Sequence, residues 1–147
     1  MKHYARFGAM IAVSTLVMFV LMYLNTYSIG HIEFSETRGY MALIMGASMA
    51  VVMLLFMRGM YANRGMNVAI VLAATATFAL SLWLVRSQAT VDDVSYMRAM
   101  IPHHSIAILT SRRAHISDPR VRALADGIIE AQVREIDEMK RLIGELD

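Results

Sequence analysis

The sequence contains no cysteine among its 147 residues, which excludes disulfide bonds, thiolate zinc sites and cysteine nucleophiles. Charged residues are also scarce, at 18% of the chain, against about 25% in an average soluble domain. The formal net charge of +2 is too small to indicate a nucleic-acid-binding protein. With 57% hydrophobic residues, the composition argues against both a disordered chain and an ordinary soluble enzyme.

The few charges are unevenly distributed along the chain. Residues 1–85 contain five basic and two acidic side chains, whereas residues 86–147 contain nine basic and ten acidic side chains. We therefore expect two domains, a membrane domain over residues 1–88 and a charged domain over residues 89–147.

Three runs without charge occupy the first domain: residues 7–30, 39–57 and 65–85, which contain 24, 19 and 21 residues. A helix of about 20 apolar residues crosses the ~30 Å hydrocarbon core of a bilayer. We predict three transmembrane helices, at about residues 6–28, 39–59 and 65–86, with the lipid bilayer as partner. A cleaved signal peptide is the alternative for the first run, but no clear A-x-A cleavage site follows it.

The basic residues of the first domain predict its orientation. Three spans place the N-terminus and the 58–64 loop on one side, and this side carries Lys2, Arg6, Arg58 and Arg64 with no acidic residue. Short cytoplasmic segments carry an excess of Lys and Arg. We therefore expect a multi-pass protein of a bacterial inner (cytoplasmic) membrane, with a cytoplasmic N-terminus and a periplasmic, extracytoplasmic C-terminal domain.

The second predicted span has a face of small residues, Ala42, Gly46 and Ala50, which is typical of closely packed membrane helices. Beside it runs a methionine stripe at a spacing of four: Met41, Met45, Met49, Met53 and Met57. We interpret this stripe as packing rather than as a metal-conducting ladder, because Met commonly fills gaps in apolar cores. No charged residue interrupts any span, which weighs against an ion-coupled transporter.

The second domain has the pattern of two amphipathic helices. Asp92 and Asp93 suit a helix N-terminus, and we expect the first helix over about residues 91–114, kinked by Pro102. Asp118 as N-cap and Pro119 at the first helical position begin the second helix, over about residues 119–143. Because the link is short, we predict an antiparallel helical hairpin and an all-α protein.

A seam of mainly apolar residues follows one face of each helix. In the second helix the seam is Val121, Ala125, Ile128, Gln132, Glu135, Met139 and Leu142, and in the first it is Met97, Met100, His104, Ala107, Ser111 and Ala114. A fold at about residue 116 brings seven side chains to one height: Met97, Met100, His103, His104, Gln132, Glu135 and Met139. Polar groups inside a packed seam are costly unless they are paired or bind a ligand. This cluster is therefore the candidate site.

The cluster has two interpretations. Thioethers suit Cu(I) and imidazoles suit Cu(I) or Cu(II), so the set fits copper. Zinc fits less well, because neighbouring His103 and His104 point about 100° apart on a helix. In the alternative interpretation no metal binds, and the polar side chains fix the helix register through hydrogen bonds. No nucleophile–base pair or Glu-x-x-His motif is present, so we expect no enzyme activity and no organic cofactor.

The same stretches resemble a known family. Residues 97–104 (MRAMIPHH), 118–121 (DPRV) and 128–136 (IIEAQVREI), with Met139, are similar to the DUF305 signature over about residues 92–143. The resemblance implies a ferritin-like helical fold, extracytoplasmic placement and, for some members, copper binding through the seven cluster residues. Two departures argue against high-capacity copper storage. Ile108 and Leu109 stand where many relatives have Met, and eleven of the fourteen Met lie at or before Met66.

These observations predict a membrane-anchored, extracytoplasmic protein that binds and handles copper, with a metal-free oligomeric membrane scaffold as the alternative. A two-helix hairpin buries little apolar area, so we expect a homo-oligomer in which hairpins pair into a four-helix, ferritin-like bundle. His115 in the link could be an outer ligand, and His31, Glu33 and Glu36 in the first loop could meet the hairpin at its surface, but we expect all four to be solvated.

Overall fold

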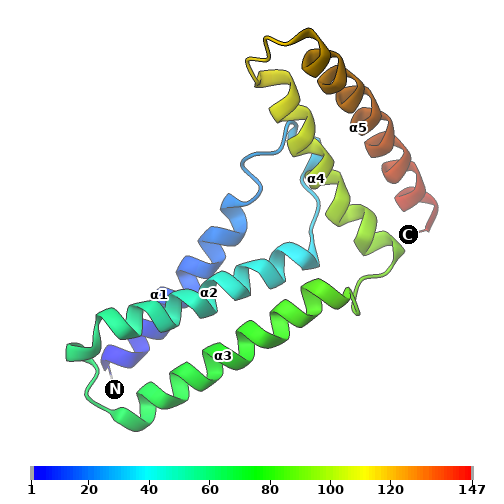
Figure 1. The fold of residues 1–147 in the computed structure, drawn as a ribbon. Coiled ribbons are helices and arrows are strands. Elements are labelled where there is room, and N and C mark those ends of the chain that lie inside the picture. Colours follow the sequence, from blue (N-terminus) through cyan, green and yellow to red (C-terminus); the bar gives the residue numbers. More distant parts are fainter. Residues whose placement is uncertain (1, 147) are drawn as a thin grey trace. The chain divides into compact units, whose positions relative to one another are not determined.

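The computed structural model describes residues 2–146, which are all-α and contain no strand. Five helices follow in order: α1 (Lys2–Leu21), α2 (Glu36–Phe56), α3 (Arg64–Ser87), α4 (Asp93–Arg113) and α5 (Pro119–Leu146) (Figure 1). Two short 3₁₀ helices, η1 (Ile29–His31) and η2 (Arg58–Met60), lie in the connections. The chain forms two compact units. One contains residues 2–22 and 37–90, and the other contains residues 23–36 and 91–146.

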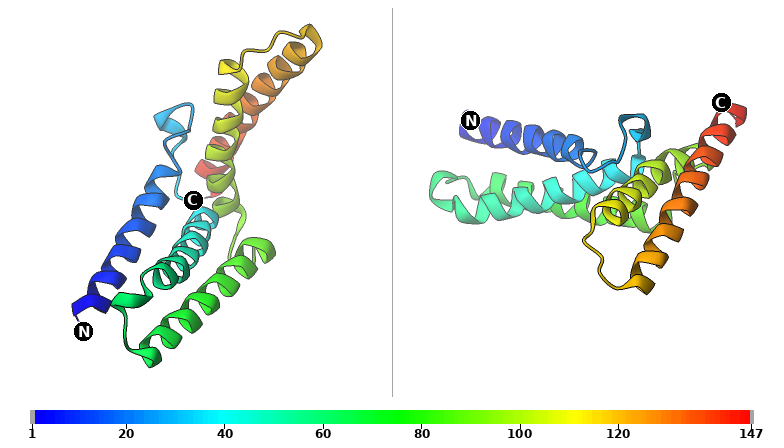
Figure 2. Two further views of the ribbon diagram at one scale, coloured as in Figure 1. Left: turned by 60° about the vertical axis from the view of Figure 1, so that its left-hand side comes forward. Right: turned by 90° about the horizontal axis from the view of Figure 1, so that it is seen from above.

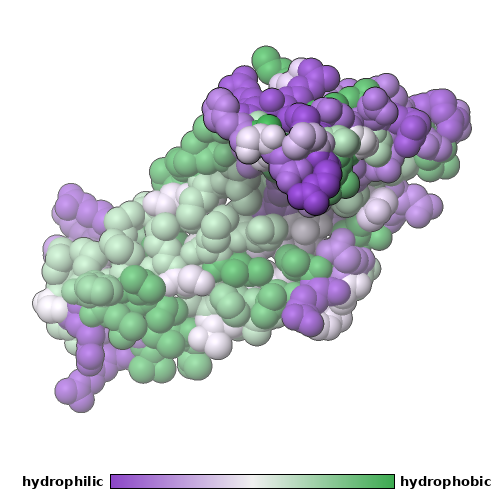
Figure 3. Space-filling model, turned by 45° about the horizontal axis from the view of Figure 1, so that its top comes forward, coloured by the Kyte–Doolittle hydropathy of each residue, from purple (hydrophilic) through white to green (hydrophobic). Residues whose placement is uncertain are grey.

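Helices α1, α2 and α3 are long and apolar enough to cross a membrane, which confirms the prediction of three such helices. Most of their side chains face outward, and Figure 3 shows hydrophobic residues spread over the visible surface of this unit. The first helix ends at Leu21, about seven residues earlier than expected. Beyond it the chain turns, with the Thr26 hydroxyl donating to the carbonyl of Tyr23 at 2.9 Å, and residues 23–36 join the second unit.

The three apolar helices lie side by side around a small core (Figure 2). Its buried members are Phe7, Ala47, Ala50, Leu54, Tyr61 and Ala74. As the sequence predicts, the small face of α2 is buried at Ala42, Gly46 and Ala50. At Gly46 the backbone approaches α1 so closely that a Cβ atom would lie 2.2 Å from Thr15 Oγ1. Small residues therefore set the spacing between α1 and α2.

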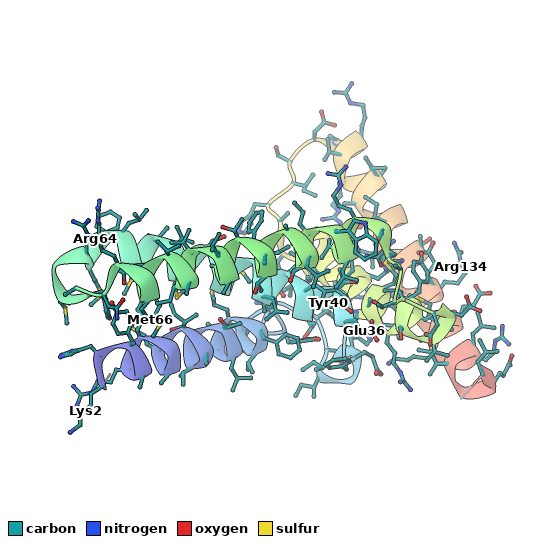
Figure 4. All side chains as sticks on the ribbon, turned by 90° about the horizontal axis from the view of Figure 1, so that it is seen from below. Lys2, Glu36, Tyr40, Arg64, Met66 and Arg134 are labelled. Carbon is teal, nitrogen blue, oxygen red and sulfur yellow. The ribbon has the colours of Figure 1, made fainter. Side chains whose placement is uncertain are left out.

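One end of this unit is basic. Lys2 and Arg64 lie together there, whereas Tyr40 lies toward the other end (Figure 4). The start of α3 is fixed at the same end by Asn63, whose side chain accepts a hydrogen bond from the N–H three residues later at 3.0 Å. The Tyr4 hydroxyl also accepts the Asn63 N–H at 3.2 Å. The unit thus has the charge asymmetry on which the predicted orientation depends.

In the second unit, α4 and α5 pack against each other and run in opposite directions (Figure 1). Both helix starts are capped by the expected carboxylates. Asp92 Oδ1 accepts the Ser95 N–H at 2.7 Å, and Asp118 Oδ1 accepts the Arg120 N–H at 2.8 Å. These hydrogen bonds lower the pKa of Asp92, and the Arg120 side chain and backbone lower the pKa of Asp118. The helix N-termini are therefore suited to the ionised carboxylates.

Candidate functional site

The buried face of α4 differs from the predicted seam. Its buried positions are Met97, Ile101, Pro102, Ser105 and Ile108, so the face is rotated about the helix by roughly one residue after Met97. Met100, His104 and Ala107 lie at its edge and are half-buried. The rotation has a physical reason, because it buries the wholly apolar Ile101 and Ile108 and leaves the polar His104 at the edge.

The buried face of α5 is rotated in the same way. Ala125, Ile136 and Met139 are buried, and Ile129, Leu142 and Ile143 pack against the same core. Two members of the predicted seam, Val121 and Ile128, are exposed. These packing residues come equally from the predicted seam (Ala125, Met139 and Leu142) and from positions beside it (Ile129, Ile136 and Ile143). The polar members of the predicted cluster consequently lie beside the helix interface rather than at its centre.

His104 and Glu135, both members of the predicted cluster, are brought together from the two helices, although a fold at residue 116 places His104 level with Ile128 rather than with Glu135. His104 Nε2 lies 2.7 Å from Glu135 Oε2, and His104 Nδ1 lies 2.9 Å from the carbonyl oxygen of Met100, one turn earlier on α4. The His104 side chain is 13% exposed, whereas that of Glu135 is 47% exposed. The pair is therefore fixed at its imidazole and open to solvent at its carboxylate.

Both nitrogens of the His104 ring face an acceptor. A carbonyl oxygen and an ionised carboxylate have no proton to donate, so both contacts are hydrogen bonds only when each ring nitrogen carries a proton. Without the second proton, the Nδ1–H bond to the Met100 carbonyl fixes the tautomer and leaves the Nε2 lone pair directed at Glu135.

The other five predicted site residues have different environments. Met97 and Met139 are buried in the apolar core of the unit, and Met100 packs against it. Gln132 is half-buried. His103 is exposed, and its ring centroid lies 6.1 Å from that of His104. Three thioethers and the His104–Glu135 pair are thus combined in one helix pair, while His103 faces solvent as expected for adjacent helical residues.

Within residues 2–146, no group of three or more His, Asp or Glu side chains is arranged to hold a metal ion. The described residues therefore do not form a zinc site from oxygen and imidazole ligands alone. Structural zinc sites take four protein ligands, and catalytic zinc sites take three. A metal bound at His104 would need thioether ligands or ligands from a second molecule.

Residues 23–36 form a contact next to the site, on α4, that we did not expect from the sequence. Residues 23–36 pack on α4, where Ser105 is completely buried. The Ser105 hydroxyl accepts the Tyr27 N–H at 2.7 Å and lies 2.9 Å from His31 Nδ1. The expectation that His31 is a solvated loop residue is therefore wrong. Glu33 and Glu36 are likewise half-buried rather than solvated, whereas His115 is exposed as expected.

A second contact joins this segment to α4. Arg112 Nη1 donates to the Tyr27 hydroxyl at 2.5 Å, and the guanidinium carbon lies 4.9 Å from the centroid of the Tyr27 ring. Burial lowers the pKa of His31, and the positive charge of Lys140 on α5 lowers it further, against a smaller opposing effect of Asp137. The neutral imidazole therefore suits this contact, with the Ser105 O–H donating to Nδ1. The one sequence feature that could have indicated this contact is a serine, Ser105, in the middle of an apolar helix face.

The fold and the site define a class of protein: three apolar helices of membrane-spanning length joined to an amphipathic helix pair with a His–Glu pair at its edge. Residues 81–146 match the family described as a domain of unknown function, DUF305. The chain is also 33% identical over 145 residues to the uncharacterized protein L153 of Acanthamoeba polyphaga mimivirus, covering 94% of this chain and 93% of that protein.

The chain therefore belongs to the DUF305 family, as its motifs predict. The match to the viral protein extends across the apolar helices as well as the helix pair, because it covers nearly the whole of both chains. No solved structure is significantly similar to this chain.

Proposed function

We propose that this protein is a membrane-anchored, extracytoplasmic protein that binds copper on the α4–α5 helix pair. The observation that carries the proposal is the orientation of His104. Its Nδ1 is held by the Met100 carbonyl at 2.9 Å, and its Nε2 is directed at Glu135 across the helix interface. Metal-binding histidines characteristically have one ring nitrogen fixed by a backbone carbonyl and the other presented to the ion.

The donor set fits a soft ion of low coordination number. Met97, Met100 and Met139 provide thioethers in or against the same core, and thioethers together with imidazole select Cu(I). Binding at His104 Nε2 would replace its contact with Glu135, because a ligating ring nitrogen presents its lone pair to the ion. When bound, the ion is cargo, and the chain's own residues hold it in a cysteine-free site suited to an oxidising compartment.

A metal-free scaffold is the second candidate, and the completeness of the His104–Glu135 pair favours it. Both ring nitrogens have partners without any metal, and polar pairs at helix interfaces can serve only to fix register. In this case the pair contributes to stability and to nothing else. The two candidates therefore differ in what His104→Ala changes: copper affinity in the first, and thermal stability alone in the second.

Copper binding by the purified full chain in detergent, measured by competition with a Cu(I) chelator, distinguishes them. For copper binding we expect His104→Ala to weaken affinity by about 10–100-fold. Met100→Leu preserves volume at a cost below about 1.5 kcal/mol, so it is expected to weaken affinity with little loss of stability. His115→Ala, in the exposed link, is the control. Absence of copper from the intact protein, or equal retention by His104→Ala, would overturn the copper proposal.

We further propose that the N-terminus is cytoplasmic and that α4 and α5 are periplasmic, in a bacterial inner membrane. The support is the basic end of the first unit, with Lys2 and Arg64 (Figure 4), together with Arg6 and Arg58 in the same terminal and loop segments. A C-terminal fusion to a reporter that is active only outside the cytoplasm is expected to be active. Activity of a cytoplasm-only reporter at this position would refute the orientation.

We also propose a homo-oligomer in which α4–α5 pairs from two copies form a four-helix bundle. The support is the apolar face that α5 leaves exposed, at Val121, Leu124 and Ile128. A second copy would cover this face and supply further ligands near Glu135. The mass of the protein–detergent complex tests this. We expect Leu124→Glu to shift it toward the monomer, and a folded wild-type monomer would contradict the proposal.

A further inference from the structure

The segment between α1 and α2 has an inverted distribution of polarity. Four of its large apolar side chains are exposed: Ile29 by 87%, Leu24 by 75%, Phe34 by 67% and Ile32 by 49%. Its histidine and its two glutamates are half-buried: His31, Glu33 and Glu36. A loop that faces water normally exposes its charges and covers its large apolar side chains. This segment does the reverse, so its outer face is suited to an apolar environment.

The inward-facing groups of the segment account for its fixed conformation. The Tyr27 N–H and His31 Nδ1 both meet the buried hydroxyl of Ser105, and the Tyr27 side chain meets Arg112. Three polar groups of Tyr27 and His31 are thus held by α4, while the large apolar side chains of the segment remain exposed. Exposed apolar patches of this kind mark membrane or partner contacts.

Chain connectivity indicates which partner this is. If α1 and α2 span the membrane, as the proposed anchoring requires, then both ends of the segment emerge at one membrane surface, at Leu21 and Glu36. Half of the segment, about seven residues, reaches at most ~25 Å even when fully extended. The segment therefore cannot leave the neighbourhood of the bilayer, where Phe, Tyr and Leu side chains are favoured at the interface.

We propose that Leu24, Ile29, Ile32 and Phe34 insert into the interfacial region of the bilayer and form a membrane-contacting surface of the extramembrane unit. This inference rests on the proposed membrane anchoring and is independent of copper binding. Its consequence is mechanical: the segment contacts lipid through its apolar face and α4 through Ser105 and Arg112. The lipid contact thereby restrains the helix that carries His104.

Tryptophan fluorescence of the full chain in phosphatidylcholine vesicles tests the proposal. Trp83, the single native tryptophan, lies in α3 and reports on membrane insertion in the wild-type protein. In a Trp83→Phe background, Phe34→Trp and Ile29→Trp each place the probe in the segment. Leu124→Trp on α5 is the matched control, because Leu124 is 66% exposed, nearly the same as Phe34. Circular dichroism verifies that each variant retains its helices.

We expect acyl-chain-brominated phosphatidylcholine to quench Phe34→Trp and Ile29→Trp by about twofold or more, since interfacial side chains reach ~5–10 Å into the headgroup–acyl boundary. Leu124→Trp should not be quenched. Two results overturn the proposal: quenching of both segment probes by aqueous acrylamide without quenching by brominated lipid, or resistance to both quenchers, which would indicate cover by protein such as a second copy. Unquenched wild-type Trp83 would instead refute the anchoring itself.

Discussion

The close approach of α1 and α2 at Gly46 gives a quantitative prediction for Gly46→Ala. The added Cβ would lie 2.2 Å from Thr15 Oγ1, 3.2 Å from its Cγ2 and 3.3 Å from its Cβ. Rotation of the Thr15 side chain exchanges one clash for another, because all three of these atoms are close. Overpacking of this kind costs about 1–3 kcal/mol, against a gain of about 0.5–1 kcal/mol from replacing a helical Gly. We expect a net loss of about 1–2 kcal/mol.

The partner substitution makes this prediction specific. Thr15→Ala removes the two nearest atoms, so the double variant should regain most of the loss, with a coupling energy of about 1–2 kcal/mol. The assay is loss of helical circular dichroism during titration of mixed micelles with a denaturing detergent. Gly39→Ala is the control, because it makes the same change in α2 with nothing within 4 Å of the new Cβ. If Gly46→Ala is as stable as Gly39→Ala, or if Thr15→Ala fails to rescue it, the packing argument is wrong.

Two further predictions concern the contact between residues 23–36 and α4. Ser105→Ala removes the acceptor of the Tyr27 N–H at a fully buried position and should lower the thermal stability of the second unit by about 1 kcal/mol, whereas half-buried Ser111→Ala should not. The lowered pKa of His31, caused by burial and then by Lys140, means that the unfolded state takes up the proton first as the pH falls. Stability is then complete above about pH 6.5 and declines below it. Thermal midpoints measured on both sides of this pH should differ in the wild type and less in His31→Asn, and equal differences in the two proteins would contradict this assignment.

The features that follow from local sequence were predictable. Long charge-free runs give apolar helices whatever the tertiary context, because only length and hydropathy are required. Caps at Asp92 and Asp118 follow from side-chain chemistry within a few residues. Membership of His104 and Glu135 in one cluster was also predictable from the two helix seams, whereas their direct contact was not, because a fold at residue 116 places His104 level with Ile128.

The choice between two possible buried faces of a helix could not be predicted from the sequence. On α4 the buried face runs through Ile101 and Ile108 rather than through the predicted Met100 and His104. The two faces differ by one residue around the helix, and periodicity alone does not distinguish them. The burial of Ser105 depends on Tyr27 and on a sequence separation of 78 residues. No local pattern marks such a contact, and Tyr27, which makes it, lies within the predicted first transmembrane helix.

The composition of the second unit from two separated stretches of chain has a consequence for biosynthesis. His31 is made 74 residues before its partner Ser105, which corresponds to roughly 4–15 s at the usual speed of translation. During that interval two further apolar helices are synthesised, and residues 23–36 cannot yet pack against α4. A fragment that begins at residue 91, although it holds nearly all of the family match, would lack the cover over Ser105. In this protein the family domain is completed by a part of the chain that was made first.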